Sequence, residues 1–245
     1  ISVALSGTPL DNIEQSCYAV PNFYTKANLL VHLLKDNATF KKVLVFVSNK
    51  KSADRLFLEL QEYYSEEICV VHSNKTQNYR MRSIKQFDEG FNRILVTTDV
   101  MARGLDLNTI SHVINFDTPS YPENYIHRIG RTGRAEKKGE SLLLYTELEL
   151  DHKKAIETLM NMEISQLPFP EEVEIANRLI AEEQPIVNEP NNPLNESDEE
   201  RGPSFHDKSE KNKKTNLGSS YKRMIKTKFK KPKTRGDKNY NKRKK

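Results

Sequence analysis

Short apolar runs alternate with stretches of helical spacing along residues 1–165, and this alternation limits the possible folds more than any other feature. The run Val43–Val47 is entirely apolar, which is typical of a strand buried in a parallel sheet. Ser52–Tyr64 follows it with its apolar residues at helical spacing. Similar patterns predict further strands at Ile13–Val20, Ile68–Val71, Ile94–Val96, Val113–Phe116 and Leu142–Tyr145, and helices at Thr25–Leu34 and Gln77–Glu89. We therefore predict an α/β three-layer domain with a mostly parallel sheet.

Charge divides the chain into three blocks. Residues 1–165 carry 20 basic and 21 acidic residues, residues 166–200 carry one basic and 10 acidic residues, and residues 201–245 carry 18 basic and 3 acidic residues. The last block has too little apolar surface to offset the entropy of ordering the chain, so we predict a disordered tail. The middle block is predicted to be an acidic linker, in which residues 171–183 form a short amphipathic helix.

The basic tail has three possible roles. Its charge favours binding to nucleic acid, because contact between lysines and several phosphates releases counterions and does not require the tail to fold. Tyr221, Phe229 and Tyr240 lie among its lysines and can stack on bases. A solubilising extension and an anionic membrane surface are the alternatives, although no amphipathic apolar face accompanies the charge.

Several classes of protein and site are excluded by the sequence. No run reaches the roughly 18 apolar residues that a membrane helix needs. Cys17 and Cys69 are too few for a disulfide framework or a four-cysteine zinc site, and we expect reduced, structural thiols. The chain begins at Ile1 without a signal-peptide pattern, so we expect a fragment of a longer, cytoplasmic protein.

Small polar residues follow four of the predicted strands. In open α/β sheets, ligands gather at the carboxyl ends of the strands. The residues at these ends are Ser48 and Asn49, His72, Thr98 and Asp99, and Asp117. Hydroxyl groups and loop amides suit phosphate oxygens, but the same residue types also cap helices. Four such loops on one edge favour a ligand groove.

The segment Tyr125–Arg134 carries the strongest functional signal. In a helix, Arg128, Arg131 and Arg134 would recur on one face, where their charges repel one another. Gly130 and Gly133 would each weaken that helix by roughly 1 kcal/mol. Glycines allow a polyanion to approach closely, and arginines offer bidentate donors to phosphate. The segment therefore predicts a phosphate-binding element.

These residues resemble a known family. The run 127–134 is similar to motif VI of DEAD-box RNA helicases in superfamily 2, and 98–106 resembles motif V. Residues 43–49 resemble motif IV, and 77–80 resemble the Gln-x-x-Arg element. The similarity covers about residues 1–165 and implies the C-terminal RecA-like domain. Residues 167–170 and the basic tail are similar to bacterial RhlE-type members.

The resemblance implies ATP with Mg²⁺ as cofactor, the metal being held mainly by an N-terminal RecA-like domain of the same polypeptide. Arg131 and Arg134 would be catalytic arginine fingers that reach the γ-phosphate. Asp106 would bind the ribose, and Arg103 and His127 would link the nucleotide state to domain closure. The implied nucleotide-binding residues are Arg103, Gly104, Asp106, His127 and Arg128.

The family also implies RNA as a partner, with no membrane partner and a monomeric protein. Contact to the RNA backbone would allow the enzyme to act on many sequences. The implied RNA-binding residues are Ser48, Asn49, His72, Gln77, Arg80, Thr98 and Asp99. One position departs from the family, since Ser73 follows His72 where a glycine is usual.

The sequence contains neither the phosphate-binding loop nor the Asp-Glu-Ala-Asp motif of the other helicase domain. We therefore expect this chain alone to hydrolyse almost no ATP and to bind RNA weakly, and residues 1–11 to include the end of the interdomain linker. Two other functions remain open. A superfamily 2 DNA translocase would share the arginine arrangement but would not depend on 2′-hydroxyl groups. A non-catalytic RNA-binding or annealing module would depend on the tail and would not need ATP.

Overall fold

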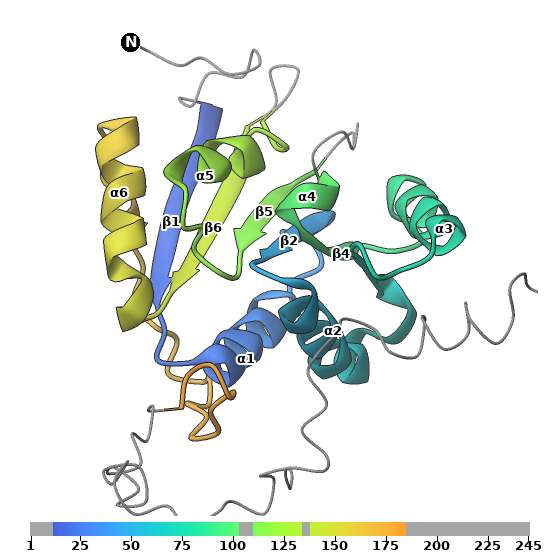
Figure 1. Cartoon of the computed structure of the whole chain (residues 1–245), viewed down its shortest axis with the longest axis horizontal. Coiled ribbons are helices and arrows are strands. Elements are labelled where there is room, and N and C mark those ends of the chain that lie inside the picture. Colours follow the sequence, from blue (N-terminus) through green and yellow to red (C-terminus); the bar gives the residue numbers. More distant parts are fainter. Residues whose placement is uncertain (1–11, 103–109, 134–137, 185–245) are drawn as a thin grey trace, which may run out of the picture. The chain divides into compact units, whose positions relative to one another are not determined.

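The computed structural model describes residues 12–102, 110–133 and 138–184 of the 245-residue chain (Figure 1). The expected end of the interdomain linker at residues 1–11 and the basic tail lie outside these residues, and so does the acidic stretch from Glu189 to Glu200. Four predicted site residues also lie outside them: Arg103, Gly104, Asp106 and Arg134.

Within the described part of the chain, seven strands form one sheet in the order β3-β4-β2-β5-β6-β1-β7, and every pair is parallel. The strands are β1 Ile13–Ala19, β2 Val43–Val47, β3 Ile68–Val71, β4 Ile94–Thr98, β5 His112–Asn115, β6 Gly139–Tyr145 and β7 Ser165–Gln166. The helices are α1 Phe23–Leu33, α2 Lys50–Tyr64, α3 Gln77–Asp88, α4 Asp99–Ala102, α5 Pro122–Ile129 and α6 Leu150–Met160. The predicted α/β fold with a parallel sheet is confirmed.

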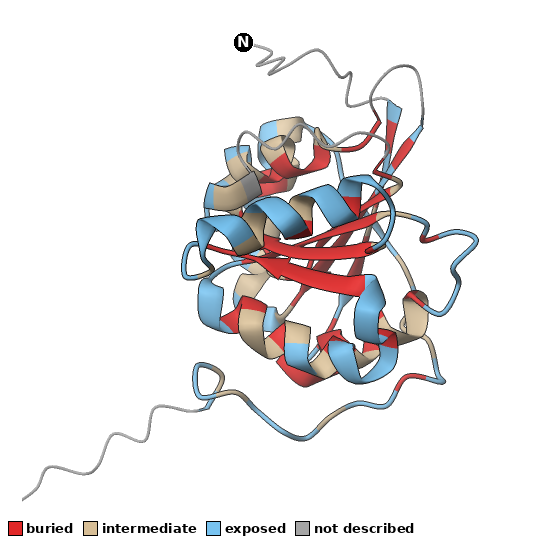
Figure 2. Ribbon diagram, turned by 90° about the vertical axis from the view of Figure 1, so that its right-hand side faces the viewer, coloured by how far each residue is buried: buried red, intermediate tan, exposed pale blue. Residues whose placement is uncertain are grey.

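Alternate residues of β2 show how the three layers form. Val43, Val45 and Val47 pack with α1 and α2 on one face of the sheet. Leu44 and Phe46 pack on the other face with α3. Farther along that second face, α5 and α6 cover β1 and β6. The strands are therefore buried between two layers of helices (Figure 2), as their unbroken apolar sequence predicts.

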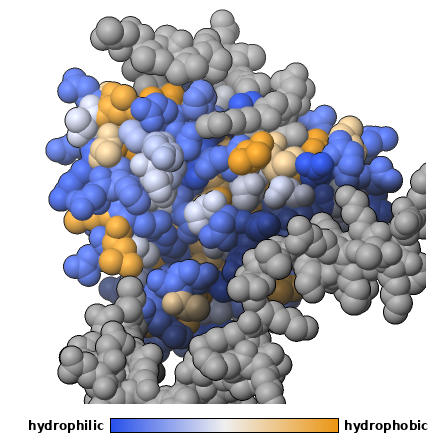
Figure 3. Space-filling model, viewed as in Figure 1, coloured by the Kyte–Doolittle hydropathy of each residue, from blue (hydrophilic) through white to orange (hydrophobic). Residues whose placement is uncertain are grey.

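The surface visible in Figure 3 is mostly hydrophilic, with small separate hydrophobic patches. No helix among the described residues is long and apolar enough to cross a membrane. Cys17 and Cys69 are both buried free thiols, as predicted, and burial raises the pKa of the Cys69 thiol to about 12.

The segment of residues 167–184, named here the strap, differs from the prediction. The helix predicted at residues 171–183 is wrong, because these residues form turns and irregular backbone. The amide of Asn22 donates to the carbonyl of Ala176 at 2.6 Å, and the Thr25 hydroxyl accepts from the Ala176 N–H at 3.0 Å. Side chains of α1 and its N-cap therefore supply hydrogen bonds that a helix would have made internally.

The far end of the strap lies on the N-terminus of α1. A carboxylate oxygen of Glu183 accepts from the Phe23 N–H at 2.6 Å, and the other accepts from the Ile180 N–H at 3.1 Å. Val173 is buried in the core beneath α1. An anionic group is favoured at a helix N-terminus, so the contact between Glu183 and the Phe23 N–H stabilises both the strap and α1.

Candidate functional site

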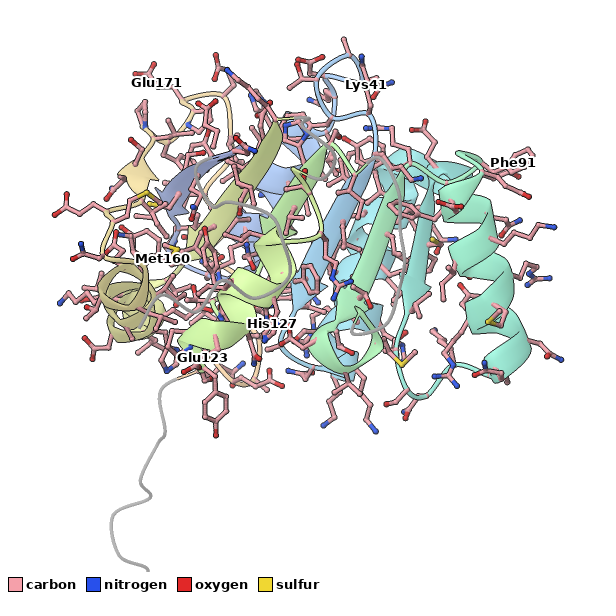
Figure 4. The ribbon with its side chains drawn as sticks, turned by 90° about the horizontal axis from the view of Figure 1, so that it is seen from above. Lys41, Phe91, Glu123, His127, Met160 and Glu171 are labelled. Carbon is pink, nitrogen blue, oxygen red and sulfur yellow. The ribbon has the colours of Figure 1, made fainter. Side chains whose placement is uncertain are left out.

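The predicted site residues meet at one edge of the sheet because all its strands run in the same direction. β2 lies between β4 and β5, with Val47 beside Thr98 and Phe46 beside Asn115. The loops after these strands therefore emerge together. Figure 4 shows His127 at one end of the sheet, and Lys41 and Phe91 at the opposite end.

Arg128 lies at the centre of this edge and is buried, with 2% of its surface exposed. Its Nε and Nη2 donate to the two carboxylate oxygens of Asp99 at 2.6 and 2.8 Å. Its Nη1 donates to Asn115 Oδ1 at 3.1 Å and to the carbonyl of Asp117 at 2.8 Å. The guanidinium also lies 5.1 Å from the centroid of the Phe46 ring. Arg128 thus joins α5 to the ends of β4 and β5.

Asp117 extends this network to the loop after β2. The backbone N–H of Ser48 donates to Asp117 Oδ2 at 2.7 Å, while the Asp117 carbonyl accepts from Arg128. Ser48 itself is exposed. The first residue after β2 is therefore held in place by the same group of side chains that holds α5.

The segment Tyr125–Arg131 is helical only as far as Ile129. α5 ends at Ile129 with Gly130 as its C-cap, so Arg128 and Arg131 do not share a helix face. The hydroxyl of Thr132 donates to the carbonyl of Ile110 at 2.8 Å, which anchors the turn that follows. His127 is half-buried on α5, and Arg131 is half-buried in the turn. A short helix and an anchored turn therefore position these two side chains.

Gly133 is required by this turn. Its φ of +68° is a conformation that side chains rarely adopt, and a Cβ placed there would lie 2.9 Å from a carbon of Ile13. The sequence predicted that this glycine lets a ligand approach. Ile13 of β1 lies beside this glycine and would collide with any side chain there, while the approach of a ligand stays a prediction.

Gln77 and Arg80 contact each other on the first turn of α3. Arg80 Nη2 donates to Gln77 Oε1, and Arg80 Nη1 lies 3.2 Å from the sulfur of Met101 in α4. This pair therefore lies against the helix that begins with Asp99. The helices α3 and α4, which carry predicted RNA-binding residues, thus touch through Arg80 and Met101, although these two residues are 21 positions apart in the sequence.

Three of the predicted RNA-binding side chains are committed to internal contacts. His72 is 1% exposed; its Nδ1 accepts from the Asn74 N–H at 3.3 Å, so its Nε2 donates to Asp54 at 2.9 Å. Asn49 caps α2, and its side-chain oxygen accepts from two backbone N–H groups. The carboxylate of Asp99 is paired with Arg128. The sequence left two roles open for these polar loop residues, phosphate binding and helix capping. The side chain of Asn49 caps a helix.

The remaining residues of these loops differ in exposure. Thr98 is buried at the end of β4. Ser73 is exposed in the turn after β3. Burial raises the pKa of the Asp54 carboxyl, but hydrogen bonds from Lys75 and His72 outweigh this effect and hold the pKa below its usual value.

Two residues of this edge were missed by the sequence analysis. Lys26 is 2% exposed on α1; its Nζ donates to Glu149 at 2.6 Å and to the carbonyl of Phe116 at 2.8 Å. Glu149 also accepts from the backbone N–H groups of Thr118 and Thr146. The only sequence signal was Thr146 with a glutamate three residues later, which is the pattern of a capping box.

The partly exposed side chains that could contact a nucleotide carry nitrogen atoms that donate hydrogen bonds. His127 and Arg131 are the described members of the predicted nucleotide-binding and catalytic set with partly exposed side chains. Imidazole and guanidinium groups fit phosphate oxygens. In residues 12–102, 110–133 and 138–184, no three His, Cys, Asp or Glu residues gather as a metal site. The donor set thus fits the phosphates of ATP, and these residues offer no ligand cluster for its metal.

Comparison with known proteins agrees with this geometry. The family model described as "Helicase conserved C-terminal domain" matches residues 25–136. The DEAD-box ATP-dependent RNA helicase CshA of Bacillus cereus is 40% identical over 187 residues, which cover 74% of this chain and 35% of CshA. The chain spans about a third of the length of the curated relatives it matches.

Two solved structures are similar in fold and sequence. The E. coli DEAD-box protein SrmB, bound to regulator of ribonuclease activity A, has a TM-score of 0.62 and 32% identity, with 69% of this chain and 98% of that chain covered. S. cerevisiae Dbp5 bound to RNA and ADP BeF3 has a TM-score of 0.59 and 32% identity, with 64% of this chain and 42% of that chain covered.

Proposed function

Because this chain belongs to the DEAD-box family of RNA helicases and contains the family's C-terminal helicase domain, we propose that it forms half of an ATP-dependent RNA helicase. The other half is an N-terminal RecA-like domain of the same polypeptide. ATP hydrolysis between the two domains drives local unwinding of RNA duplexes or remodelling of RNA–protein complexes. This chain supplies arginine fingers and part of the RNA groove.

The contacts of Arg128 are the observation that carries this proposal. One buried guanidinium binds Asp99 at the start of α4 and the carbonyl of Asp117, whose carboxylate holds the Ser48 amide. Arg131 follows three residues later in the chain. The expected RNA-binding loops therefore share one buried network, and the backbone N–H of the expected arginine finger Arg131 donates to the carbonyl of the same Arg128 at 3.0 Å, which suits an enzyme that links RNA binding to hydrolysis. In this proposal Arg128 is a positioning residue.

On the nucleotide side, Arg131 and Arg134 stabilise the charge that develops on the γ-phosphate. An arginine finger contributes about 10³–10⁵ in rate, or roughly 4–7 kcal/mol of barrier. Asp106 accepts hydrogen bonds from the ribose, and Gly104 allows close backbone approach. Arg103 and His127 respond to the nucleotide state. The magnesium ion is held mainly by the N-terminal domain.

On the RNA side, contacts to phosphates and sugars explain action without sequence preference. The exposed Ser48 and the partly exposed Arg80 are the described residues best placed for such contacts. Asn49, His72 and Asp99 shape the loops through their internal hydrogen bonds, and their backbone amides remain candidates for phosphate contact. Gln77 orients Arg80, and Thr98 ends β4 beside Val47 of β2.

RNA-stimulated ATP hydrolysis tests this function. The measurement uses a polypeptide that carries both helicase domains, with this chain alone as the control. We expect RNA to stimulate turnover of the two-domain polypeptide, DNA of the same sequence to stimulate it far less, and the chain alone to stay near background. Equal stimulation by DNA would favour a DNA translocase.

Strand annealing without ATP tests the alternative of a tail-driven RNA-binding module. If remodelling persists without ATP and is lost when residues 201–245 are deleted, the helicase proposal is wrong. The RhlE-type assignment, which rests on residues 167–170 and the tail, stays a prediction.

A further inference from the structure

A cavity of about 490 Å³ lies beside β3, the strand at one edge of the sheet, between the end of α2 and one face of α3. Its size is typical of a site for a small ligand or part of a larger one. Ile68 and Cys69 of β3 line it. Figure 4 shows Phe91, which also lines it, at the end of the sheet opposite His127.

The side chains around this cavity have the chemistry of a base-binding site. Tyr79 and Phe91 line it, and Phe91 is 72% exposed although it is a large apolar residue. The amides of Gln61 and Gln86 also line it and can donate and accept hydrogen bonds. Unpaired RNA bases are recognised by aromatic side chains that stack on their faces and by polar groups that bind their edges.

Positive charge gathers at the Tyr79 end of the cavity. The guanidinium of Arg82 lies 5.9 Å from the centroid of the Tyr79 ring, and the ammonium of Lys75 lies 5.8 Å from it. Glu66 lines the cavity and is exposed. A phosphate is therefore favoured beside Tyr79, while a carboxylate such as Glu66 suits the amino group of a base.

The cavity is next to the expected RNA path. Arg80 faces α4, whereas Tyr79, Arg82 and Gln86 on the adjacent face of the same helix line the cavity. Tyr79 and Gln86 are seven residues apart, which is about 10 Å along a helix. An RNA strand that leaves Arg80 can thus place its next nucleotide along this face.

We propose that this cavity binds unpaired RNA bases from the strand that leaves the groove, one stacked on Tyr79 and another on Phe91. This inference rests on the proposed function, because it requires an RNA strand at Arg80. It assigns α3 two roles: one face contacts the RNA backbone, and the other holds a single-stranded flank. A helicase with such a site prefers substrates with a single-stranded extension.

Tryptophan fluorescence tests the site directly, because the chain contains no tryptophan. Phe91→Trp keeps an aromatic ring in the cavity and introduces a single fluorophore. We expect a single-stranded RNA of about ten nucleotides, within the site sizes of single-strand binders, to quench this fluorophore. Tyr63→Trp is the matched control, since Tyr63 is 65% exposed on α2 and does not line the cavity. We expect the same RNA to leave its emission unchanged.

A second substitution separates stacking from general attraction. In the Phe91→Trp background, we expect Tyr79→Ala to abolish the quenching and to weaken RNA binding by roughly fivefold or more. Lys85→Gln removes an exposed charge from the same helix without lining the cavity, and we expect it to leave the quenching unchanged. The proposal is wrong if RNA does not change the emission of the Phe91→Trp variant. It is also wrong if RNA quenches the emission equally after Tyr79→Ala is added.

RNA binding, measured by fluorescence anisotropy on the same samples, distinguishes a failure of the proposed base site from a failure of the proposed function. If RNA binds the Phe91→Trp variant but does not quench its fluorescence, only the base-site proposal is wrong. The cavity would then bind another class of ligand, such as a peptide. No RNA binding by the chain or by the two-domain polypeptide contradicts the proposed function as well.

Discussion

Arg128 holds Asp99 through two hydrogen bonds of 2.6 and 2.8 Å, and this pair connects α5 to the start of α4. The two residues are 29 positions apart in the sequence. The arginine is 2% exposed, so its charge is compensated inside the protein. Arg128, which lies in the predicted phosphate-binding segment, therefore stabilises the structure of the site.

Asp99→Ala is expected to destabilise the chain by about 2–4 kcal/mol, because it leaves the buried Arg128 without its carboxylate partner. The other hydrogen bonds of Arg128 limit the loss. Urea unfolding of the chain measures it. Glu89→Ala removes an exposed i,i+4 partner of Lys85 and should change stability by less than about 0.5 kcal/mol. Equal effects of the two substitutions would show that the Arg128 pair is not a buried ion pair.

Glu149→Ala is expected to cost about 2–4 kcal/mol for a similar reason. It removes the partner of the buried Lys26 and leaves the N–H groups of Thr118 and Thr146 without an acceptor. Thermal unfolding measures the loss. Glu147→Ala is the control, because Glu147 lies with Glu149 in the 3₁₀ helix Glu147–Glu149 and no hydrogen bond involves its side chain among those described. A Tm equal to that of the control would contradict the role of Glu149.

Gly133→Ala should destabilise the chain more than Gly90→Ala. Both glycines have positive φ, +68° and +86°, so both substitutions introduce backbone strain of roughly 1–2 kcal/mol. Only the Cβ at position 133 meets a neighbour, the side chain of Ile13 at 2.9 Å, whereas none lies within 4 Å at position 90. Urea unfolding of both variants separates strain from collision, and equal losses would mean that Ile13 moves aside freely.

Stability should fall as the pH drops below about 6.5, in part because of His112. Burial lowers the pKa of this imidazole, and the opposing effect of Glu140 only partly offsets it. The unfolded chain therefore binds the proton first, at a pKa of about 6.5, and protonation favours unfolding. Unfolding by urea between about pH 5 and 7.5 measures this dependence.

His112→Gln should make that dependence weaker. Glu140→Gln removes the group that raises the pKa of His112 and should make the dependence steeper. The same slope in all three proteins would contradict this assignment.

Much of the sheet was predictable because its central strands are continuous apolar runs such as Val43–Val47. Such a strand removes all its side chains from water only when both of its faces are covered. β7 was not predictable, since Ser165 and Gln166 are two exposed polar residues that pair with β1 only through tertiary contact. α6 was missed because only Ile156 among its residues is fully buried, which leaves a weak apolar pattern.

The candidate site was predictable at the level of its loops but not of its contacts. The order of parallel strands determines that Ser48, Asp99 and Asp117 share one edge. The burial of Arg128 depends on partners 11 and 29 residues away, and arginine is rarely buried without such partners. The end of α5 at Ile129 follows from Gly130, a residue that the sequence analysis identified as weakening a helix through this segment.

The effect of Arg131→Ala on RNA-stimulated ATP hydrolysis tests the central claim most directly. The measurement uses the two-domain polypeptide, with RNA binding measured in parallel. Arg178→Ala is the matched control, because Arg178 lies in the strap, 4.2 Å from the centroid of the Tyr24 ring and outside the predicted site. The account predicts that turnover falls about a hundredfold or more while RNA binding is kept, because the guanidinium acts on the transition state. Unchanged turnover with intact RNA binding would contradict it and would leave residues 127–134 a role in RNA binding or domain packing.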